Sequence, residues 1–160
     1  MIDFPLTQQD CPICQGTVDV PVDVVPALAS MPERLAAALS AAKDRDAKGW
    51  SPRYVALHLA DLEVSRGWRF RMILGEDNPL LAGLDQDGWA DQLAYDTRDI
   101  DLALQVFAVN RAANVELLRQ AGAPARARGY QHSQLGQLTF GTLVDHTAHH
   151  DLAHLRQIIG

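Results

Sequence analysis

Apolar side chains recur every three or four residues along four long segments of the chain, which is the period of an amphipathic α-helix. The second segment begins with Ser51 and Pro52, a helix N-cap followed by a proline suited to the first turn. The third ends just before Gly122, a residue typical of the position after a helix. The pattern therefore predicts four helices, over about 26–45, 52–75, 99–121 and 140–159.

The segments between these helices contain prolines and glycines, and we predict no strand in them. Residues 1–25 carry Pro5, Pro12 and Pro21, and we expect an irregular N-terminal arm there. The connections after the second and third helices are long, with at most one short helical turn expected in the former, and such loops are usually functional. The predicted fold is all-α, a four-helix bundle with long inter-helix loops over residues 26–160.

Composition and charge exclude several classes of protein. The chain has 160 residues, of which 48% are hydrophobic, so one domain can bury its own core. Its net charge of −6 offers no general attraction to nucleic acid or to anionic membranes. The start MIDFPLTQQD is unlike a signal peptide, and no apolar run approaches the roughly 20 residues that span a bilayer. We expect a cytoplasmic protein without nucleic-acid or membrane partners.

The two cysteines, Cys11 and Cys14, form a CxxC motif. Two thiolates alone do not fill a structural zinc site, and no second CxxC follows. A redox pair of the thioredoxin type would open a helix, whereas this motif precedes a proline-containing segment. An incidental or weakly functional pair is favoured over a site.

Four of the six histidines lie in the last predicted helix, in LVDHTAHHDLAHLRQII. His150 and His154 are four residues apart, so their rings stack on one helical face and can share an ion. His146 lies one turn earlier, where it either joins them as a ligand or contacts a ligand ring without binding the ion. His149 is expected near solvent.

A third imidazole, His58, occupies the inward face of the predicted helix 52–75. Three neutral histidines leave one position of a tetrahedral zinc ion open, as in catalytic sites. The alternatives are a core histidine bonded to a backbone carbonyl at position 58 and an incidental pair on the last helix.

Three acidic residues near these histidines have two interpretations each. Asp61 and Asp151 are placed to orient a ligand ring by accepting its second N–H, or they are solvated surface acids. For Asp151 the surface interpretation is favoured, because adjacent side chains diverge on a helix. For Glu63 the interpretations are a surface partner of Arg66 or Arg69, which is favoured, and a general base.

Two segments, WSPRYVALHLADLE at 50–63 and RGYQHSQLGQLTFGTLVDHTAHHDLAHLRQI at 128–158, resemble the DinB/YfiT-like superfamily. Its members are small four-helix bundles described as metal-dependent hydrolases and thiol-dependent S-transferases. The resemblance covers about 26–160 and implies a divalent metal, zinc or nickel, held by His58, His150 and His154. It also implies, for some members, a low-molecular-weight thiol such as bacillithiol or mycothiol as co-substrate.

The function predicted is that of a metal-dependent enzyme whose open metal position activates a thiol or water toward a small-molecule substrate. It would be a thiol S-transferase or a hydrolase. One alternative is a non-catalytic metal-binding stress-response protein of the same fold, without an accessible open position. Another is a structural bundle that forms a homodimer through its helices and carries its histidines incidentally.

Overall fold

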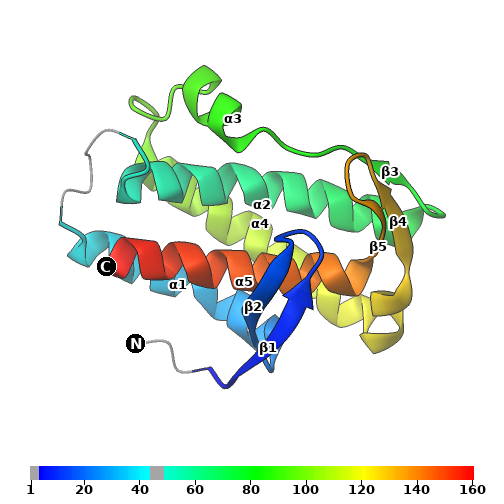
Figure 1. Ribbon diagram of the computed structural model, residues 1–160. Helices are drawn as coiled ribbons and strands as arrows, with labels where there is room; N and C mark the ends of the chain where they lie inside the picture. The colour runs from blue at the N-terminus through cyan, green and yellow to red at the C-terminus, as the bar shows by residue number, and fades with distance from the viewer. Residues whose placement is uncertain (1–3, 44–48) are drawn as a thin grey trace.

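Four long helices form the body of the protein in a computed structural model that describes residues 4–43 and 49–160 (Figure 1). Their bounds match the predicted ones closely, although the first helix begins two residues earlier than expected and ends at Ala41. The predicted helical residues 44 and 45, and residues 1–3 of the predicted arm, lie outside the described residues. The helices are α1 (Val24–Ala41), α2 (Pro52–Gly75), α4 (Ile100–Ala121) and α5 (Phe140–Ile159).

Side-chain caps fix where three of these helices begin. Asp99 accepts hydrogen bonds at 2.9 and 3.0 Å from the first free amides of α4, and Thr139 accepts one at 3.2 Å at the start of α5. Ser51 lies 3.5 Å from the Tyr54 amide at the start of α2. These oxygens satisfy backbone donors that have no partner within the helix.

The four helices form a ring. Helices α4 and α5 lie on opposite sides of it, and each of them contacts both α1 and α2. Neighbours α2 and α4 run in the same direction. Near the start of α2, Tyr54 donates a hydrogen bond of 2.8 Å to Asp96, just before α4. Beyond the end of α4, Arg128 donates one of 2.7 Å to the Ile73 carbonyl near the end of α2. The long connection 76–99 is required to return the chain between them.

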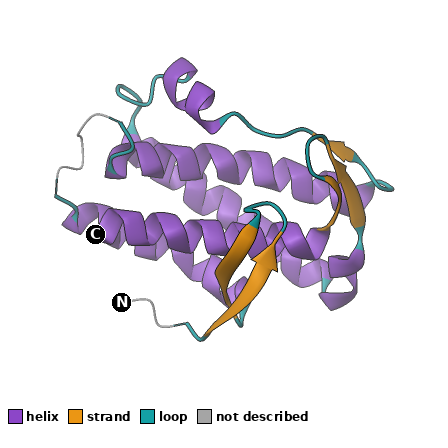
Figure 2. Ribbon diagram, viewed as in Figure 1, coloured by secondary structure: helices purple, strands orange, loops and turns teal. Residues whose placement is uncertain are grey.

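Two small sheets accompany the bundle, and the prediction of no strands was wrong (Figure 2). The residues predicted as an irregular arm form an antiparallel hairpin of β1 (Leu6–Cys11) and β2 (Gly16–Pro21), with Leu6 opposite Pro21. The hairpin packs on α5, and Val18 and Val20 of β2 are buried. Its prolines are compatible with strands because they lie at the ends of the hairpin or in its turn.

The second sheet covers one end of the bundle and involves both long connections. Strands β4 (Gly129–His132) and β5 (Gly136–Thr139) are antiparallel, and the short β3 (Leu80–Leu81) pairs with β4 in parallel. The connection 76–99 also contains the short helix α3 (Gln86–Gln92), and a 3₁₀ turn (Ala123–Ala127) follows α4. In the part of the chain described, no helix is long and apolar enough to cross a bilayer.

The buried interior consists of two apolar clusters separated by a polar layer. One cluster joins the beginnings of α2 and α4 to the ends of α1 and α5, and the other joins the opposite ends of the same helices. Between them, Arg111 of α4 forms a bidentate ion pair with Glu63 of α2, at 2.9 and 2.6 Å. Arg111 also lies 2.7 Å from Asp151 of α5, and Arg66 lies 3.0 Å from the same carboxylate.

This layer corrects two sequence predictions. Glu63 and Asp151 were expected at the surface, but they are 1% and 0% exposed. Each carboxylate is compensated by a buried guanidinium, which is the condition under which buried charges are tolerated.

Candidate metal centre

His58, His150 and His154 converge on one point, where α2 and α5 face each other. One ring nitrogen from each lies within 4.8 Å of the others, and the Nε2 atoms of His58 and His150 are 3.4 Å apart. The His58 ring centroid is 5.3 Å from that of His150 and 5.1 Å from that of His154. The helical spacing of four puts the two α5 rings 4.4 Å apart.

These distances suit a divalent ion. Zinc–nitrogen bonds of about 2.0–2.1 Å in tetrahedral geometry place two ligand nitrogens about 3.4 Å apart. The His58–His150 separation has this value before any adjustment of the side chains. The three donors are imidazoles, a ligand type that suits zinc and nickel, and they leave further coordination positions free.

Two residues of the quoted motif segments, to which no role was assigned from the sequence, hold the His154 ring. The Oε1 atom of Gln157 is 2.8 Å from His154 Nδ1, and an amide oxygen only accepts, so Nδ1 carries the proton and Nε2 is left free. Gln157 in turn donates a hydrogen bond of 3.2 Å to the Trp50 carbonyl. The Trp50 ring lies edge-on to His58 and stacked on His154, with centroids 5.1 and 6.3 Å away. The position of Gln157, three residues after His154, was the signal available in the sequence.

Among the described residues, neither acidic residue considered as an orienting partner forms a hydrogen bond with a histidine. Asp61 accepts hydrogen bonds from Tyr95 at 2.9 Å and from Arg98 at 2.6 and 3.0 Å, which tie α2 to the segment before α4. Asp151 faces the buried arginines instead. Among the described residues, the buried Nδ1 atom of His150 has no hydrogen-bond partner.

The other two histidines of α5 face the N-terminal hairpin. The ring of His146 is 5.7 Å from that of His150, but its Nδ1 lies 3.3 Å from the Cys14 sulfur and 3.7 Å from the Cys11 sulfur. His149 was expected near solvent; it is half-buried, and its Nδ1–H donates to the Asp19 carbonyl of β2 at 3.1 Å.

Burial keeps the imidazoles of the centre neutral. It lowers the pKa of His58 to about 3, and the nearby charges of His154 and Arg66 add to the effect. Burial also places the pKa of His150 well below its usual value, and that of His154 lower than usual. Neutral imidazole is the form that binds a metal, so the ligands need little deprotonation at physiological pH.

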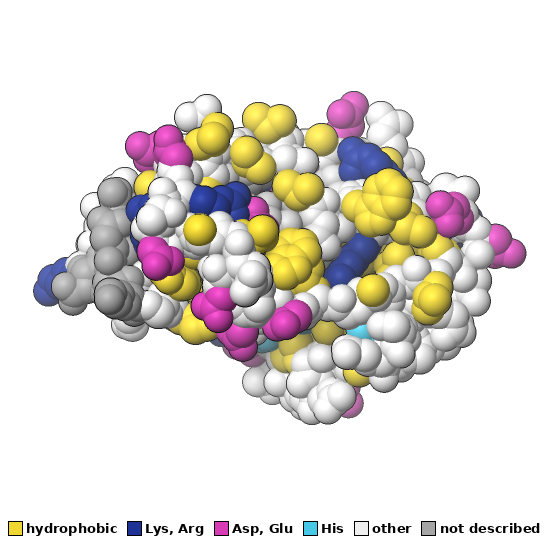
Figure 3. Space-filling model, turned by 90° about the horizontal axis from the view of Figure 1, so that it is seen from above, with side chains coloured by type: hydrophobic (Ala, Val, Ile, Leu, Met, Phe, Trp, Pro, Cys, Tyr) yellow, Lys and Arg dark blue, Asp and Glu magenta, His cyan; other side chains and the backbone are white. Residues whose placement is uncertain are grey.

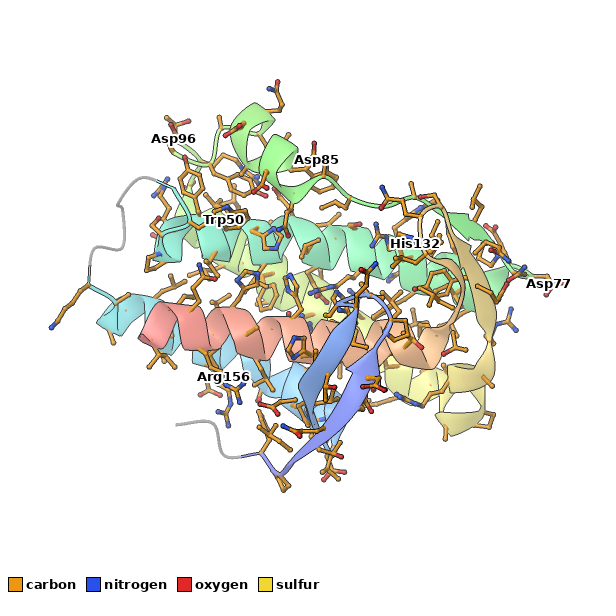
Figure 4. All side chains as sticks on the ribbon, viewed as in Figure 1. Trp50, Asp77, Asp85, Asp96, His132 and Arg156 are labelled. Atoms are coloured by element: carbon orange, nitrogen blue, oxygen red, sulfur yellow. The ribbon has the colours of Figure 1, made fainter. Side chains whose placement is uncertain are left out.

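A cavity of about 400 Å³ opens beside His150. Its lining includes Leu62, Arg66 and Arg69 of α2, and His132 from the end of β4. Trp50 and His132 lie toward opposite ends of the space between α2 and α5 (Figure 4). Seen from above, only small patches of histidine surface are visible (Figure 3).

The sequence profile of the DinB superfamily matches residues 22–158, nearly all of the bundle and both histidine-bearing helices. The chain belongs to the DinB superfamily. The match leaves out the strands of the N-terminal hairpin and agrees with the family resemblance seen in the two histidine motifs.

Relatives within the DinB superfamily carry names that refer to metal-dependent chemistry. "Putative metal-dependent hydrolase YfiT" of Bacillus subtilis is 27% identical over 115 residues, 69% of this chain and 64% of the relative. A protein of Oceanobacillus iheyensis with a corresponding name is 27% identical over 110 residues, 69% and 63% of the two chains. One from Bacillus pumilus is 31% identical over 116 residues, 69% and 65%. The chain thus spans slightly less than two thirds of these relatives.

The fold is shared with a solved structure of YfiT from Bacillus subtilis, which is described as having an unusual four-helix bundle topology. The TM-score is 0.73 at 23% identity, over 84% of this chain and 83% of the other. The predicted four-helix bundle of the DinB/YfiT-like type is therefore confirmed.

Proposed function

We propose that the protein is a metal-dependent enzyme that acts on a small molecule, either as a hydrolase or as a thiol S-transferase. The observation that carries the proposal is the convergence of three imidazole nitrogens within 4.8 Å beside a cavity of about 400 Å³. The names of its relatives, which refer to metal-dependent hydrolases, support the same class of chemistry.

His58, His150 and His154 would hold the ion, for which zinc and nickel are the best candidates. When bound, a divalent ion lowers the pKa of a water molecule or a thiol and so supplies a nucleophile near neutral pH. Neutral ligands leave the full dipositive charge available for this effect. Gln157 keeps His154 in the tautomer whose Nε2 is free, and Trp50 shields the rings of His58 and His154.

The cavity favours a small substrate with a polar or anionic group. Its volume lies within the usual range for small-molecule sites. Arg69 is half-buried on its wall and anchored by a 2.8 Å hydrogen bond to the Ala82 carbonyl. Its positive charge is compatible with a carboxylate or a polarised carbonyl on the substrate, whereas Arg66 is occupied by Asp151.

Metal content per chain, measured by elemental analysis on untagged protein incubated with zinc or nickel, tests the site. The His154→Ala variant should contain about one ion fewer than the wild type, because two nitrogens rarely retain an ion that three bind. The control is His149→Asn, which removes an imidazole outside the triad and should retain the wild-type content. Equal metal in His154→Ala and the wild type would contradict the proposal.

A second measurement separates an enzyme from a non-catalytic metal-binding protein. In cobalt-substituted protein, an added thiol or small anion should shift the visible spectrum if a coordination position is accessible. The same protein should then be assayed for hydrolysis and for thiol transfer to an electrophile. An unchanged spectrum would favour the alternative of a metal-binding stress-response protein without turnover.

A further inference from the structure

The turn of the N-terminal hairpin brings both cysteines against α5. Cys11 is the last residue of β1 and is buried, and Cys14 lies exposed in the turn that follows. The Nδ1 atom of His146 is 3.7 Å from the first sulfur and 3.3 Å from the second. The three donor atoms all lie within 4.8 Å of one another. The cluster shares no residue with the three-histidine centre.

The separations are those of ligands around one metal ion. Zinc–sulfur bonds of about 2.3 Å and zinc–nitrogen bonds of about 2.0–2.1 Å give sulfur–nitrogen distances near 3.6 Å in a tetrahedron. The two observed distances lie on either side of this value. Two thiolates and an imidazole are a donor set that zinc favours among the biological cations.

The surrounding hairpin is docked by contacts that do not involve the cysteines. His149 donates to the Asp19 carbonyl at 3.1 Å, and Arg156 pairs with the Asp19 carboxylate at 3.1 Å. Val18 and Val20 of β2 are also buried, although they share their apolar cluster with Cys11. The sulfurs are therefore held next to His146 by the fold, so that a metal would find its ligands already assembled.

A backbone contact within the turn further suits a metal-bound sulfur. The Cys14 amide N–H donates to the Cys11 sulfur at 3.4 Å, which is within the range for a hydrogen bond to sulfur. An N–H directed at a thiolate stabilises its negative charge and orients it, as supporting hydrogen bonds commonly do around metal ligands.

We propose that Cys11, Cys14 and His146 form a second metal site that binds zinc or a similar thiophilic divalent cation. Both thiols lose their protons to solvent on binding, and a fourth position is left for water. The sequence had favoured an incidental cysteine pair, because two thiolates do not complete a site. The third ligand is the imidazole of His146, which lies 132 residues after Cys14 in the chain.

The proposed site gives the hairpin a role at the substrate cavity. Ile13 and Gln15 lie in or at the edge of the cysteine turn and line the cavity beside His150, together with His146. A metal that joins the turn to α5 would fix this wall of the cavity. Its loss should loosen the wall without removing the ligands of the three-histidine centre.

The test is metal content combined with the absorption of cobalt-substituted protein, using zinc and cobalt as probes under reducing conditions. Wild-type protein should bind two ions per chain, and its cobalt form should show the near-ultraviolet charge-transfer absorption of a thiolate–cobalt bond. Cys14→Ser should bind one ion and lose this absorption. Because Cys14 is exposed, the serine variant should retain the fold.

Two controls keep this result distinct from that for the three-histidine centre. His154→Ala should lose one ion and keep the thiolate absorption, whereas His132→Asn, which removes an imidazole outside both clusters, should keep both ions. Zinc should also slow the reaction of the wild-type cysteines with a thiol reagent. The proposal is overturned if cobalt-loaded wild type shows no thiolate absorption, if Cys14→Ser binds as much metal as the wild type, or if zinc leaves thiol reactivity unchanged.

Discussion

Gln157 connects two parts of the candidate metal centre through the two ends of one amide group. Its oxygen accepts the Nδ1 proton of His154, and its nitrogen donates to the carbonyl of Trp50. The first bond selects the tautomer in which the Nε2 lone pair of His154 faces His58. The second ties the end of α5 to the turn before α2. A residue that touches no metal can therefore determine how well the third ligand is oriented.

Replacing Gln157 by leucine should lower zinc affinity about 10–100-fold, the usual cost of removing a group that orients a metal-bound histidine. The fold should persist, because the Gln157 side chain is largely exposed. Competition with a zinc chelator measures the affinity. Gln157→Glu retains an acceptor for the Nδ1 proton and should bind zinc much more tightly than the leucine variant; equal affinities in the two variants would contradict the role.

Residues such as Asp151 and Glu63 show why burial was hard to predict at single positions. Both are acidic residues on amphipathic helices, and most such residues are solvated. Their partner, Arg111, lies on another helix, 48 residues from Glu63 along the chain. No local pattern reports a pairing at that distance, whereas His58, His150 and His154 could be grouped because they occur in two recognisable motifs.

At the scale of elements, the contact between α2 and α5 determines the protonation of the histidines. His58 is buried on α2, and the rings of α5 cover it. Burial lowers the pKa values of His58 and His146 to about 3 in the metal-free protein, and that of His150 is also well below its usual value. In the unfolded chain these groups would titrate near 6.5.

The metal-free protein should therefore lose stability as the pH falls from about 6.5 toward 3. In this window the unfolded chain binds protons that the folded chain excludes, so acid favours unfolding, with a slope of up to about 1.4 kcal/mol per pH unit for each such histidine. Urea unfolding of chelator-treated protein at a series of pH values measures this effect. His58→Asn removes one titrating group and should give a shallower dependence; a stability unchanged between pH 7 and pH 5 would be inconsistent with buried neutral imidazoles.

The helices were predictable element by element, and the strands were not. The local signals are the helical spacing of apolar residues, N-caps such as Asp99, and Gly122 after the end of α4. They predicted the ends of α2, α4 and α5 to within about a residue. The hairpin β1–β2 has a local signal as well, the alternation of exposed Thr17 and buried Val18, but nearby prolines obscured it. The pairing of β3 with β4 joins segments some 50 residues apart and could not be seen in either one.

At the scale of the whole molecule, a layer of buried charge divides the interior into two apolar halves. Arg111 contacts Glu63 of α2, Asp151 of α5 and, at 3.1 Å, the Leu28 carbonyl of α1. One side chain from α4 thus contacts the other three long helices. Asp151 directly follows His150, so these ion pairs join α2 and α4 to the part of α5 that carries the histidines.

Replacing Arg111 by methionine should destabilise the protein by about 3–5 kcal/mol, because buried Glu63 loses its guanidinium partner and buried Asp151 keeps only Arg66. Denaturant unfolding of the metal-free protein measures the loss. The matched control is Arg126→Met, which removes a partly exposed ion pair with Asp145 and should cost no more than about 1 kcal/mol. Similar losses in the two variants would show that the buried layer contributes little.

The four-residue spacing of His146, His150 and His154 has a consequence for how two ions would share α5. At 1.5 Å per residue, the two proposed centres are about 9 Å apart along the helix. Two bare dipositive ions at that distance would repel each other by about 7 kcal/mol at an effective dielectric constant of 20. Exchanging the protons of Cys11 and Cys14 for one ion leaves the charge of the cysteine cluster unchanged, so this repulsion nearly vanishes. The two centres should then fill independently, without cooperativity of either sign.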